Sequence, residues 1–242
     1  MKTLNKFKMK KLLTLLLFAG IYTTATSQVY VQGGLNLANI TKSAGGATDD
    51  NNMLTTFNVG LLDRFNITPV LAFETGLLLD GRGSKSSLYA SSDHSKNFVV
   101  NKFNPLYLEI PANLVLKVPL GAQTTNGRNV FFNFGPYAAV GIAGKNKVET
   151  NIEGNSTTRS SSIKFTNDNP LTSDGEGAAY DKLKRFDFGL NVGAGIDLGK
   201  LMIKANYGFG LAKINSLQTD NNKDAKNKYR TLSVSLGVPL SR

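Results

Sequence analysis

The sequence predicts an all-β protein: an antiparallel up-and-down barrel of eight transmembrane strands with long loops at one end. Two observations lead to this fold. Eight segments alternate apolar and polar residues with the period of two that strands require, and the connections between these segments alternate long and short. The predicted strands are 29–40, 55–67, 70–80, 105–118, 129–144, 186–198, 201–213 and 229–240.

Each predicted strand has one apolar face, and the segments at 29–40, 70–80 and 129–144 follow the same period as the rest. Along 55–67 the apolar side chains are Phe57, Val59, Leu61, Phe65 and Ile67. Along 105–118 they are Leu106, Leu108, Ile110, Ala112, Leu114, Leu116 and Val118. Along 186–198 they are Phe186, Phe188, Leu190, Val192, Ala194, Ile196 and Leu198. Along 201–213 and 229–240 they are Ile203, Ala205, Tyr207, Phe209, Leu211, Leu232, Val234, Leu236, Val238 and Leu240.

The connections sort into two classes by length. Four are long and polar, at 41–54, 81–104, 145–185 and 214–228, and three are short, around Thr68-Pro69, 121–128 and Gly199-Lys200. In an up-and-down barrel this order places every long loop at one end and every short turn, with both termini, at the other. Outer-membrane barrels have this anatomy, with short periplasmic turns and long extracellular loops.

The longest connection contains a possible further hairpin. Residues 147–153 can pair with 158–165, most simply above the membrane, so the strand count is either eight or ten.

The first residues are typical of a secretory signal peptide. Five lysines precede the apolar run 12–21, and Ala25-Thr26-Ser27 forms a small-residue cleavage site. The run is shorter than the ~20 residues of a membrane-spanning helix, although a buried N-terminal helix is an alternative. We therefore expect a signal peptide at 1–27, cleavage before Gln28, and an outer-membrane barrel domain at 28–242.

Composition excludes several classes of protein. The chain has no cysteine, which rules out disulfide scaffolds, thiol nucleophiles, thiolate metal sites and a lipid-modified N-terminal cysteine. Removing the five signal lysines lowers the formal net charge from +11 to +6, and the remaining lysines are dispersed, so we expect no nucleic-acid partner. No later segment approaches ~18 consecutive apolar residues, so no transmembrane helix is predicted.

The period of two does not itself decide which face points inward. A soluble lipocalin-type barrel would bury the apolar face, whereas a membrane barrel directs it to lipid. Glycine on the polar face favours the membrane barrel, because glycine weakens a solvated strand but leaves space inside a narrow one. These glycines are Gly189, Gly193, Gly195, Gly208 and Gly210. The length of the strands and the position of all the long loops at one end also favour the membrane barrel.

An eight-stranded barrel has a lumen that side chains fill, so charges inside it need partners. A turn centred on Pro69 places Arg64 directly across from Glu74. We therefore hypothesise a lumenal ion network of Arg64, Glu74, Lys117, Asp197 and Lys204.

The other members of the network follow from the same register reasoning. Asp197 lies diagonal to Lys204 across the Gly199 turn, and Lys117 joins that layer at the short-turn end of its strand. Glu109 and Asp187 are expected to lie higher in the lumen. The alternative is that some of these charges are simply hydrated at the rim.

Several stretches resemble a known family. They are GGLNLANI at 33–40, YLEIPANLVLKVP at 107–119, FNFGPYAAVGIAG at 132–144, FGLNVGAGIDL at 188–198 and RTLSVSLGVPL at 230–240. In this order they resemble the PorT-like family of Gram-negative outer-membrane β-barrels, which are eight-stranded like the OmpA and OmpX types. The resemblance implies an outer-membrane barrel and little chemistry, although some relatives are linked to secretion or gliding. The chain departs from such barrels by ending in Ser241-Arg242 without an aromatic residue.

The sequence offers no convincing catalytic, cofactor or metal site. His94 lies in a serine-rich loop with no rigid element to hold a nucleophile against it. Asp220, Asn222 and Asp224 begin like a calcium loop, but the glycine and the final glutamate are missing. The glycines of 193–199 have the wrong spacing for a dinucleotide loop and precede a strand. We expect a protein that is not an enzyme and has no cofactor.

The expected role is structural, or partner binding through the long extracellular loops. The expected partners are outer-membrane lipid, lipopolysaccharide and an extracellular or envelope protein, with the chain itself a monomer. Basic residues around the last loop would contact lipopolysaccharide phosphates: Lys213, Lys223, Lys226, Lys228 and Arg230. The alternatives are an outer-membrane lipid-acting enzyme using His94, a narrow channel, and a soluble periplasmic ligand-binding barrel.

Overall fold

The computed structural model describes residues 27–41, 53–90, 96–121, 128–165, 182–214 and 227–240. The strands within these ranges are β1 (Ser27–Thr41), β2 (Leu54–Asn66), β3 (Leu71–Gly81), β4 (Ser84–Tyr89), β5 (Phe98–Pro119), β6 (Asn129–Ile152), β7 (Asn155–Ser162), β8 (Lys164–Phe165), β9 (Lys182–Leu183), β10 (Phe186–Asp197), β11 (Met202–Gly210) and β12 (Lys228–Pro239).

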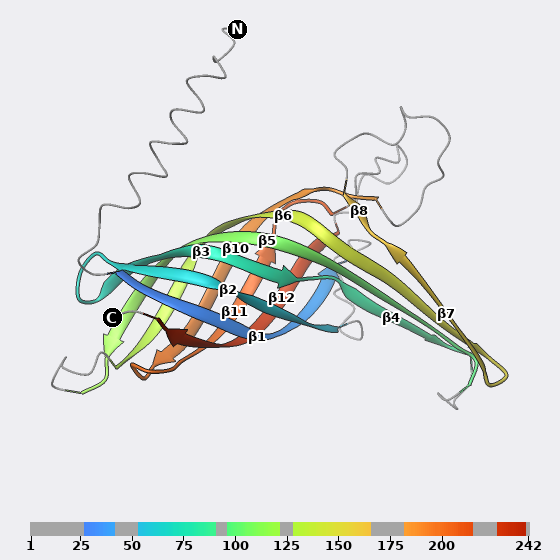
Figure 1. Ribbon diagram of the computed structural model, residues 1–242, viewed down its shortest axis with the longest axis horizontal. Coiled ribbons are helices and arrows are strands. Elements are labelled where there is room, and N and C mark those ends of the chain that lie inside the picture. The colour runs from blue at the N-terminus through green and yellow to red at the C-terminus, as the bar shows by residue number, and fades with distance from the viewer. Residues whose placement is uncertain are drawn as a thin grey trace, which may run out of the picture.

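Eight of these strands close into an antiparallel ring, as predicted (Figure 1). The ring runs β1-β2-β3-β5-β6-β10-β11-β12, and β12 pairs with β1 to complete it, with Tyr30 opposite Pro239. Closure leaves the ring without an edge strand, which is the condition for a sheet to lie in lipid. The turns at 67–70 and 198–201 lie at the same end as the start of β1 and the end of β12. We refer to this end as the turn end and to the opposite end as the loop end.

The barrel is inside out relative to a soluble protein, which confirms the transmembrane assignment of the two faces. On the outside, Leu35 is 64% exposed and Phe134 is 56% exposed. On the inside, Arg64 and Glu74 are buried at 1% and 0% exposure. A soluble barrel would bury the first pair and expose the second, so the structure contradicts that alternative. Within the described ranges we find no helical segment with the length and apolar character of a membrane span.

The connection predicted at 81–104 is not a loop along most of its length, and this part of the prediction was wrong. After a break at Arg82-Gly83, β4 continues β3 along the same partner strand, and β5 begins at Phe98. The polar sequence hid these strands because residues beyond the membrane have no lipid to face. The apolar alternation therefore stops there although the strands do not.

The hairpin considered within 145–185 is present, with a tighter turn than expected. β6 continues to Ile152, and β7 returns from Asn155 so that Ile152 lies opposite Asn155. β8 and β9 form a separate two-stranded parallel pair. The ring itself has eight strands, and these additional strands lie outside it.

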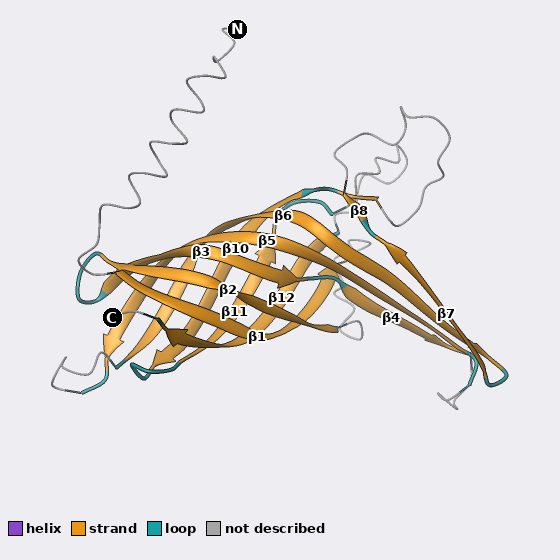
Figure 2. Cartoon of the chain, viewed as in Figure 1, coloured by secondary structure: helices purple, strands orange, loops and turns teal. Residues whose placement is uncertain are grey.

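Four strand segments extend beyond the ring at the loop end, and we call them the blade (Figures 1 and 2). The blade consists of β4, residues 98–104 of β5, residues 145–152 of β6, and β7. β5 and β6 have 22 and 24 residues, about twice the ~9–11 that a tilted strand needs to cross a bilayer. A register shift between Leu106 and Tyr107, which adds one residue to β6, separates the ring from the blade.

Some sequence predictions fall outside the described residues. They are the signal peptide up to residue 26, His94, the stretch Asp220–Asp224, Lys223, Lys226 and the terminal Ser241-Arg242.

Candidate functional site: the barrel lumen

A cluster of buried ion pairs lies near the turn end of the lumen, and we call it the turn-end cluster. Arg64 Nη2 lies 2.6 Å from Glu74 Oε2, and Lys204 Nζ lies 2.6 Å from Glu74 Oε1. Tyr30 donates its hydroxyl to Glu74 Oε2 at 2.6 Å, and Asn113 donates to Oε1 at 3.2 Å. Glu74 is therefore the acceptor at the centre, with two cations around it.

The register of β2 and β3 creates this cluster. The tight turn at 67–70 sets Arg64 opposite Glu74, as the sequence analysis predicts. The Arg64 guanidinium also lies 4.4 Å from the centre of the Phe131 ring and 5.6 Å from that of Tyr30, a cation–π geometry. Gly195 makes room for the Phe131 ring, because a Cβ there would come within 2.4 Å of it.

Two residues that the sequence analysis assigned to this network, Lys117 and Asp197, make their hydrogen bonds outside the turn-end cluster, although the charge of Asp197 acts on Arg64 and on Lys117. Lys117 is half-buried, and its Nζ donates to Asn66 Oδ1 at 2.6 Å. Asp197 is diagonal to Lys204 in register, but its Oδ1 accepts the Gly199 N–H at 2.8 Å. The ion pairs of the described residues do not include Lys117 or Asp197. Lys204 instead reaches across the lumen to Glu74.

A second cluster lies nearer the loop end, and we call it the loop-end cluster. Its centre is Arg82, which is 2% exposed and forms ion pairs with three carboxylates. Nε lies 2.6 Å from Asp80 Oδ2, Nη2 pairs with Glu109, and Nη1 pairs with Asp187.

Aromatic residues and an amide enclose the loop-end cluster. The Arg82 guanidinium lies 4.7 Å from the Tyr137 ring centre and 5.1 Å from that of Tyr107. The Tyr137 hydroxyl donates to Asp187 Oδ2 at 3.0 Å, and Asn191 donates to Glu109 Oε1 at 3.0 Å.

Sequence reasoning missed the centre of the loop-end cluster. It placed Glu109 and Asp187 above the first network but assigned no cation to them, because Gly81-Arg82-Gly83 resembles the start of a loop. One signal was available. Every second residue after Glu74 points into the lumen, and this series includes Asp80 and Arg82. Because Glu109 and Asp187 also point inward and need a cation, Arg82 could have been predicted as their partner.

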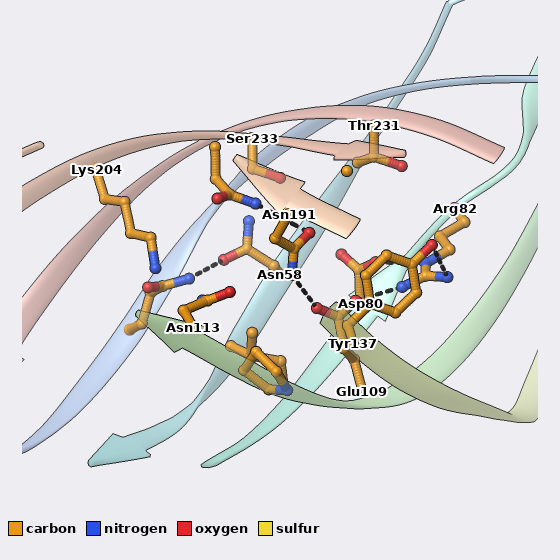
Figure 3. A pocket seen from close by; sticks show the side chains of 15 residues that line it. Asn58, Asp80, Arg82, Glu109, Asn113, Tyr137, Asn191, Lys204, Thr231 and Ser233 are labelled. Carbon is orange, nitrogen blue, oxygen red and sulfur yellow. Dashed lines mark hydrogen bonds and ion pairs between the residues drawn. The ribbon is translucent and has the colours of Figure 1, made fainter. Parts of the chain in front are cut away.

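A small polar cavity of about 40 Å³ separates the two clusters (Figure 3). Arg82, Asp80 and Glu109 line one side, and Lys204 and Asn113 line the other. A water needs about 10–15 Å³ of such space, together with two to four polar partners. The cavity therefore has room for a few waters, and the buried Asn113 Oδ1, which has no partner among the described residues, points to one.

Side-chain amides connect the loop-end cluster to the cavity wall. Asn36 donates to Asp80 Oδ1 at 2.6 Å and accepts from Asn58 at 2.6 Å. Asn58 in turn accepts from Gln32 at 3.2 Å and from Ser235 at 3.0 Å. Such connected networks hold their members in one arrangement, so the cavity is rigidly built.

Apolar side chains close the lumen beyond each cluster. Towards the loop end, Ile163, Leu183 and Ile214 pack with Tyr107, Tyr137 and Tyr229. Phe165 of β8 lies against this group, edge-on to Tyr107 with ring centres 5.5 Å apart. Towards the turn end, the buried group is Tyr30, Leu62, Ala72, Val115, Phe131 and Met202. The lumen is therefore an enclosed chamber along the described part of the chain.

The lumenal carboxylates named above all have bonding partners within the barrel. Each buried carboxylate named above accepts a hydrogen bond or an ion pair. In the part of the chain that the structure describes, no three His, Cys, Asp or Glu side chains are grouped so that they could hold a metal ion.

Comparison with solved structures finds bacterial proteins of low sequence identity. Ail of Yersinia pestis is 15% identical, with 89% of this chain and 99% of that chain covered and a TM-score of 0.39. Neisserial surface protein A is 14% identical, with 87% and 96% covered and a TM-score of 0.39. OprG of Pseudomonas aeruginosa is 11% identical, with 90% and 97% covered and a TM-score of 0.42.

The sequence comparisons give one result at the level of the family. No curated protein matches the chain. The family model described as "Outer membrane protein beta-barrel domain" matches residues 18–216, which is most of the chain. The closed ring of eight antiparallel strands, apolar outside and polar inside, is the structure expected of such a domain. The chain belongs to the outer membrane protein β-barrel domain family.

Proposed function

We propose that this protein is a closed, non-catalytic barrel that presents the blade outside the cell, where the blade binds a partner in the cell envelope. The observation that carries the proposal is the blade itself. It extends four strand segments beyond the membrane-spanning ring, and both of its outer strands, β4 and β7, have one unpaired edge among the described pairings. An unpaired edge is a template for adding a strand from another chain.

The enclosed lumen supports a structural role over a channel. The Lys204–Glu74 and Arg82–Asp187 ion pairs cross the lumen, and apolar groups lie beyond each of them. An ion would have to break these contacts to pass. We infer that the barrel anchors the blade and does not conduct.

The absence of catalysis is part of the proposal, and the bonding of the polar groups supports it. A nucleophile needs a base within ~3 Å and a space for the reacting atom. The three carboxylates around Arg82 form ion pairs with that guanidinium instead of facing a nucleophile.

We also propose that the chain belongs to the PorT-like branch of these barrels. The two sharpest stretches of the resemblance, YLEIP and GPY, lie on the paired strands β5 and β6 and contribute Glu109 and Tyr137. Both residues contact Arg82. An alignment of PorT-like barrels tests the assignment, because a basic residue should accompany this pair.

The orientation of the barrel is the first thing to test. We propose that the turn end and the termini face the periplasm and the blade faces outward. The chain has no cysteine, so a single Ser160→Cys or Lys200→Cys substitution gives one labelling site at either end. In intact cells, a membrane-impermeant maleimide should label Ser160→Cys and should reach Lys200→Cys only after permeabilisation. The reverse pattern overturns the proposal.

Conductance and loss of the blade test the rest of the proposal. The purified barrel in planar bilayers should give no stepwise current, and regular steps would instead favour the channel.

Replacing residues 84–101 by a short glycine-serine linker should leave a folded barrel that shifts on electrophoresis after boiling. If crosslinking in cells recovers the same neighbours from this variant as from the wild type, the blade is not the binding surface.

A further inference from the structure

We propose that a row of lysines across the lipid-side face of the blade binds the phosphate groups of outer-leaflet lipid headgroups. The row consists of Lys85, Lys102 and Lys147, which we call the lysine row. The inference rests on the proposed outward orientation of the blade. It adds a binding site that neither the fold nor the family assigns.

The pairing register places the three lysines side by side. Lys85 of β4 lies opposite Lys102 of β5, and Lys102 lies opposite Lys147 of β6. Neighbouring strands are ~4.8 Å apart, so the three ammonium groups belong to three adjacent strands at one level. Lys145 lies on the same face, opposite Asn104 and diagonal to Lys102.

The lysine row continues the lipid-facing side of the barrel. Side chains alternate faces along a strand, so Lys102 shares its face with Leu106, Leu108 and the exposed Ile110 of β5. The extra residue in β6 sets Lys147, in place of Asn146, opposite Lys102 beyond the register shift, so Lys147 shares the face of Lys102. The three lysines therefore point outward along the membrane side, not into the lumen.

The lysine row lies within side-chain reach of the headgroup region. Lys102 is four residues beyond Leu106, which corresponds to ~13 Å along the strand and to ~10 Å along the membrane normal for a strand tilted by about 40°. The polar region of each leaflet is ~5–8 Å thick. Lysine side chains, which are long and flexible, can span the remaining distance.

The charge balance of this face leaves an excess of cations. Like charges directly opposite each other on a sheet are destabilising, and here three lie in one row. The only carboxylate paired with them in the described residues is Glu149, whose oxygens lie 2.6 Å from Lys147 Nζ and 3.7 Å from Lys102 Nζ. A hydrogen bond from Lys147 and the charge of Lys102 lower the pKa of Glu149.

A phosphate supplies what the row lacks. It carries up to two negative charges and three acceptor oxygens, and its hydrogen bonds with ammonium groups are charge-assisted. A headgroup phosphate also reaches the row from the side on which the apolar strand faces meet lipid. A protein partner at this level would have to displace the headgroups first.

The test uses the full chain folded in detergent micelles and a lipid of known charge. Native mass spectrometry measures retention of bisphosphorylated lipid A and of the same lipid after removal of both phosphates. We expect the wild-type protein to prefer the phosphorylated lipid by roughly tenfold. The triple variant Lys85→Gln, Lys102→Gln, Lys147→Gln should lose that preference. The variant Glu149→Gln, which removes the competing carboxylate, should increase it.

Matched controls separate this site from general positive charge. The triple variant Lys164→Gln, Lys184→Gln, Lys200→Gln removes the same charge from exposed lysines elsewhere and should bind as the wild type does. All variants should keep the electrophoretic shift on boiling that marks a folded barrel. If the row variant retains the wild-type preference, the inference is wrong. If inorganic phosphate at matched concentration displaces the lipid completely, the row is a simple anion site and the lipid assignment is overturned.

The lipid-binding measurement in micelles can be made and interpreted separately from the orientation test. If Ser160→Cys is labelled only after permeabilisation, the proposed function fails whatever the row binds. If the blade faces outward and the row variant still prefers phosphorylated lipid, only the further inference fails.

Discussion

The two ion clusters in the lumen have opposite charge balance. In the turn-end cluster, two cations share one carboxylate, Glu74. In the loop-end cluster, one cation, Arg82, serves three carboxylates. Both lie in the same narrow chamber, and about 40 Å³ of polar space separates them.

This difference shows which residue each cluster depends on. Removing one partner of a buried ion pair leaves an uncompensated charge, and the cost rises with the number of charges left behind. The minority charge is therefore the sensitive position: Glu74 in one cluster and Arg82 in the other. Substitution of one of the more numerous charges, such as Lys204 or Asp80, should cost less, because the central residue of the cluster still keeps at least one partner of opposite charge.

The largest effect is expected from Arg82→Met. The substitution keeps much of the side-chain volume but leaves Asp80, Glu109 and Asp187 without a cation. The free energy of unfolding should fall by at least ~3–5 kcal/mol, measured by urea titration of the barrel in lipid vesicles at neutral pH. Arg159→Met, on the exposed strand β7, is the matched control and should stay within ~0.5 kcal/mol of the wild type.

A rescue experiment makes this prediction specific to charge. Adding Glu109→Gln and Asp187→Asn to Arg82→Met should recover part of the lost stability, because amides need no counter-ion. If the triple variant is less stable than Arg82→Met alone, the loss comes from packing around the Tyr137 ring instead of from charge.

The second largest effect is expected from Glu74→Gln. It leaves Arg64 and Lys204 unpaired, but two features soften the loss relative to Arg82. Arg64 retains its contact with the Phe131 ring, and Lys204 borders the polar cavity. We expect a loss of ~2–4 kcal/mol in the same urea titration.

A compensated variant is the control for Glu74. The combination Glu74→Gln, Arg64→Met, Lys204→Met replaces the whole cluster with neutral side chains, which is often neutral or stabilising. It should therefore be more stable than Glu74→Gln alone. Equal stability would mean that the cluster contributes through shape and not through charge.

The difference between the clusters also explains what the sequence could predict. The Arg64–Glu74 register follows from a short turn and from an apolar face that lipid enforces on both strands, so counting from Pro69 finds it. Lipid also fixes which face is inside, because a one-residue slip would expose every polar side chain to the bilayer.

The loop-end cluster and the partners of Lys117 and Asp197 were not predicted, because no apolar pattern or short turn fixes them in the sequence. At Arg82 the lumen meets the blade, where no lipid imposes an apolar pattern, and the flanking glycines imitate a loop. Lys117 and Asp197 were placed at the right level, but register alone does not say which of several neighbours a long side chain bonds. Tertiary geometry across the barrel decided that, as Lys204 shows by reaching Glu74.

A smaller effect is expected at two glycines that each pack against a phenylalanine ring, Gly195 near the turn end and Gly141 near the loop end. A Cβ at Gly195 would lie 2.4 Å from the fully buried Phe131 ring and 2.4 Å from the Ile203 carbonyl oxygen. A Cβ at Gly141 would lie 2.1 Å from the ring of Phe165, which belongs to the two-residue strand β8 and is only partly buried. Gly195→Ala should cost ~1–3 kcal/mol by overpacking, whereas Gly141→Ala should cost less than ~1 kcal/mol because Phe165 can move. Equal losses in urea titration would contradict this difference between the ends.

The smallest effect tests whether Asp197 belongs to the turn-end cluster. Asp197→Asn keeps an acceptor for the Gly199 N–H and removes a charge that forms no ion pair among the described residues, so we expect the free energy of unfolding to change by less than ~1 kcal/mol. A double-mutant cycle between Asp197→Asn and Lys204→Met should give a coupling energy near zero. The corresponding cycle between Glu74→Gln and Lys204→Met should give at least ~1 kcal/mol, because those side chains are in contact. If Asp197 couples to Lys204 as strongly as Glu74 does, the cluster extends to the Gly199 turn and the lower cost expected for its more numerous charges is wrong.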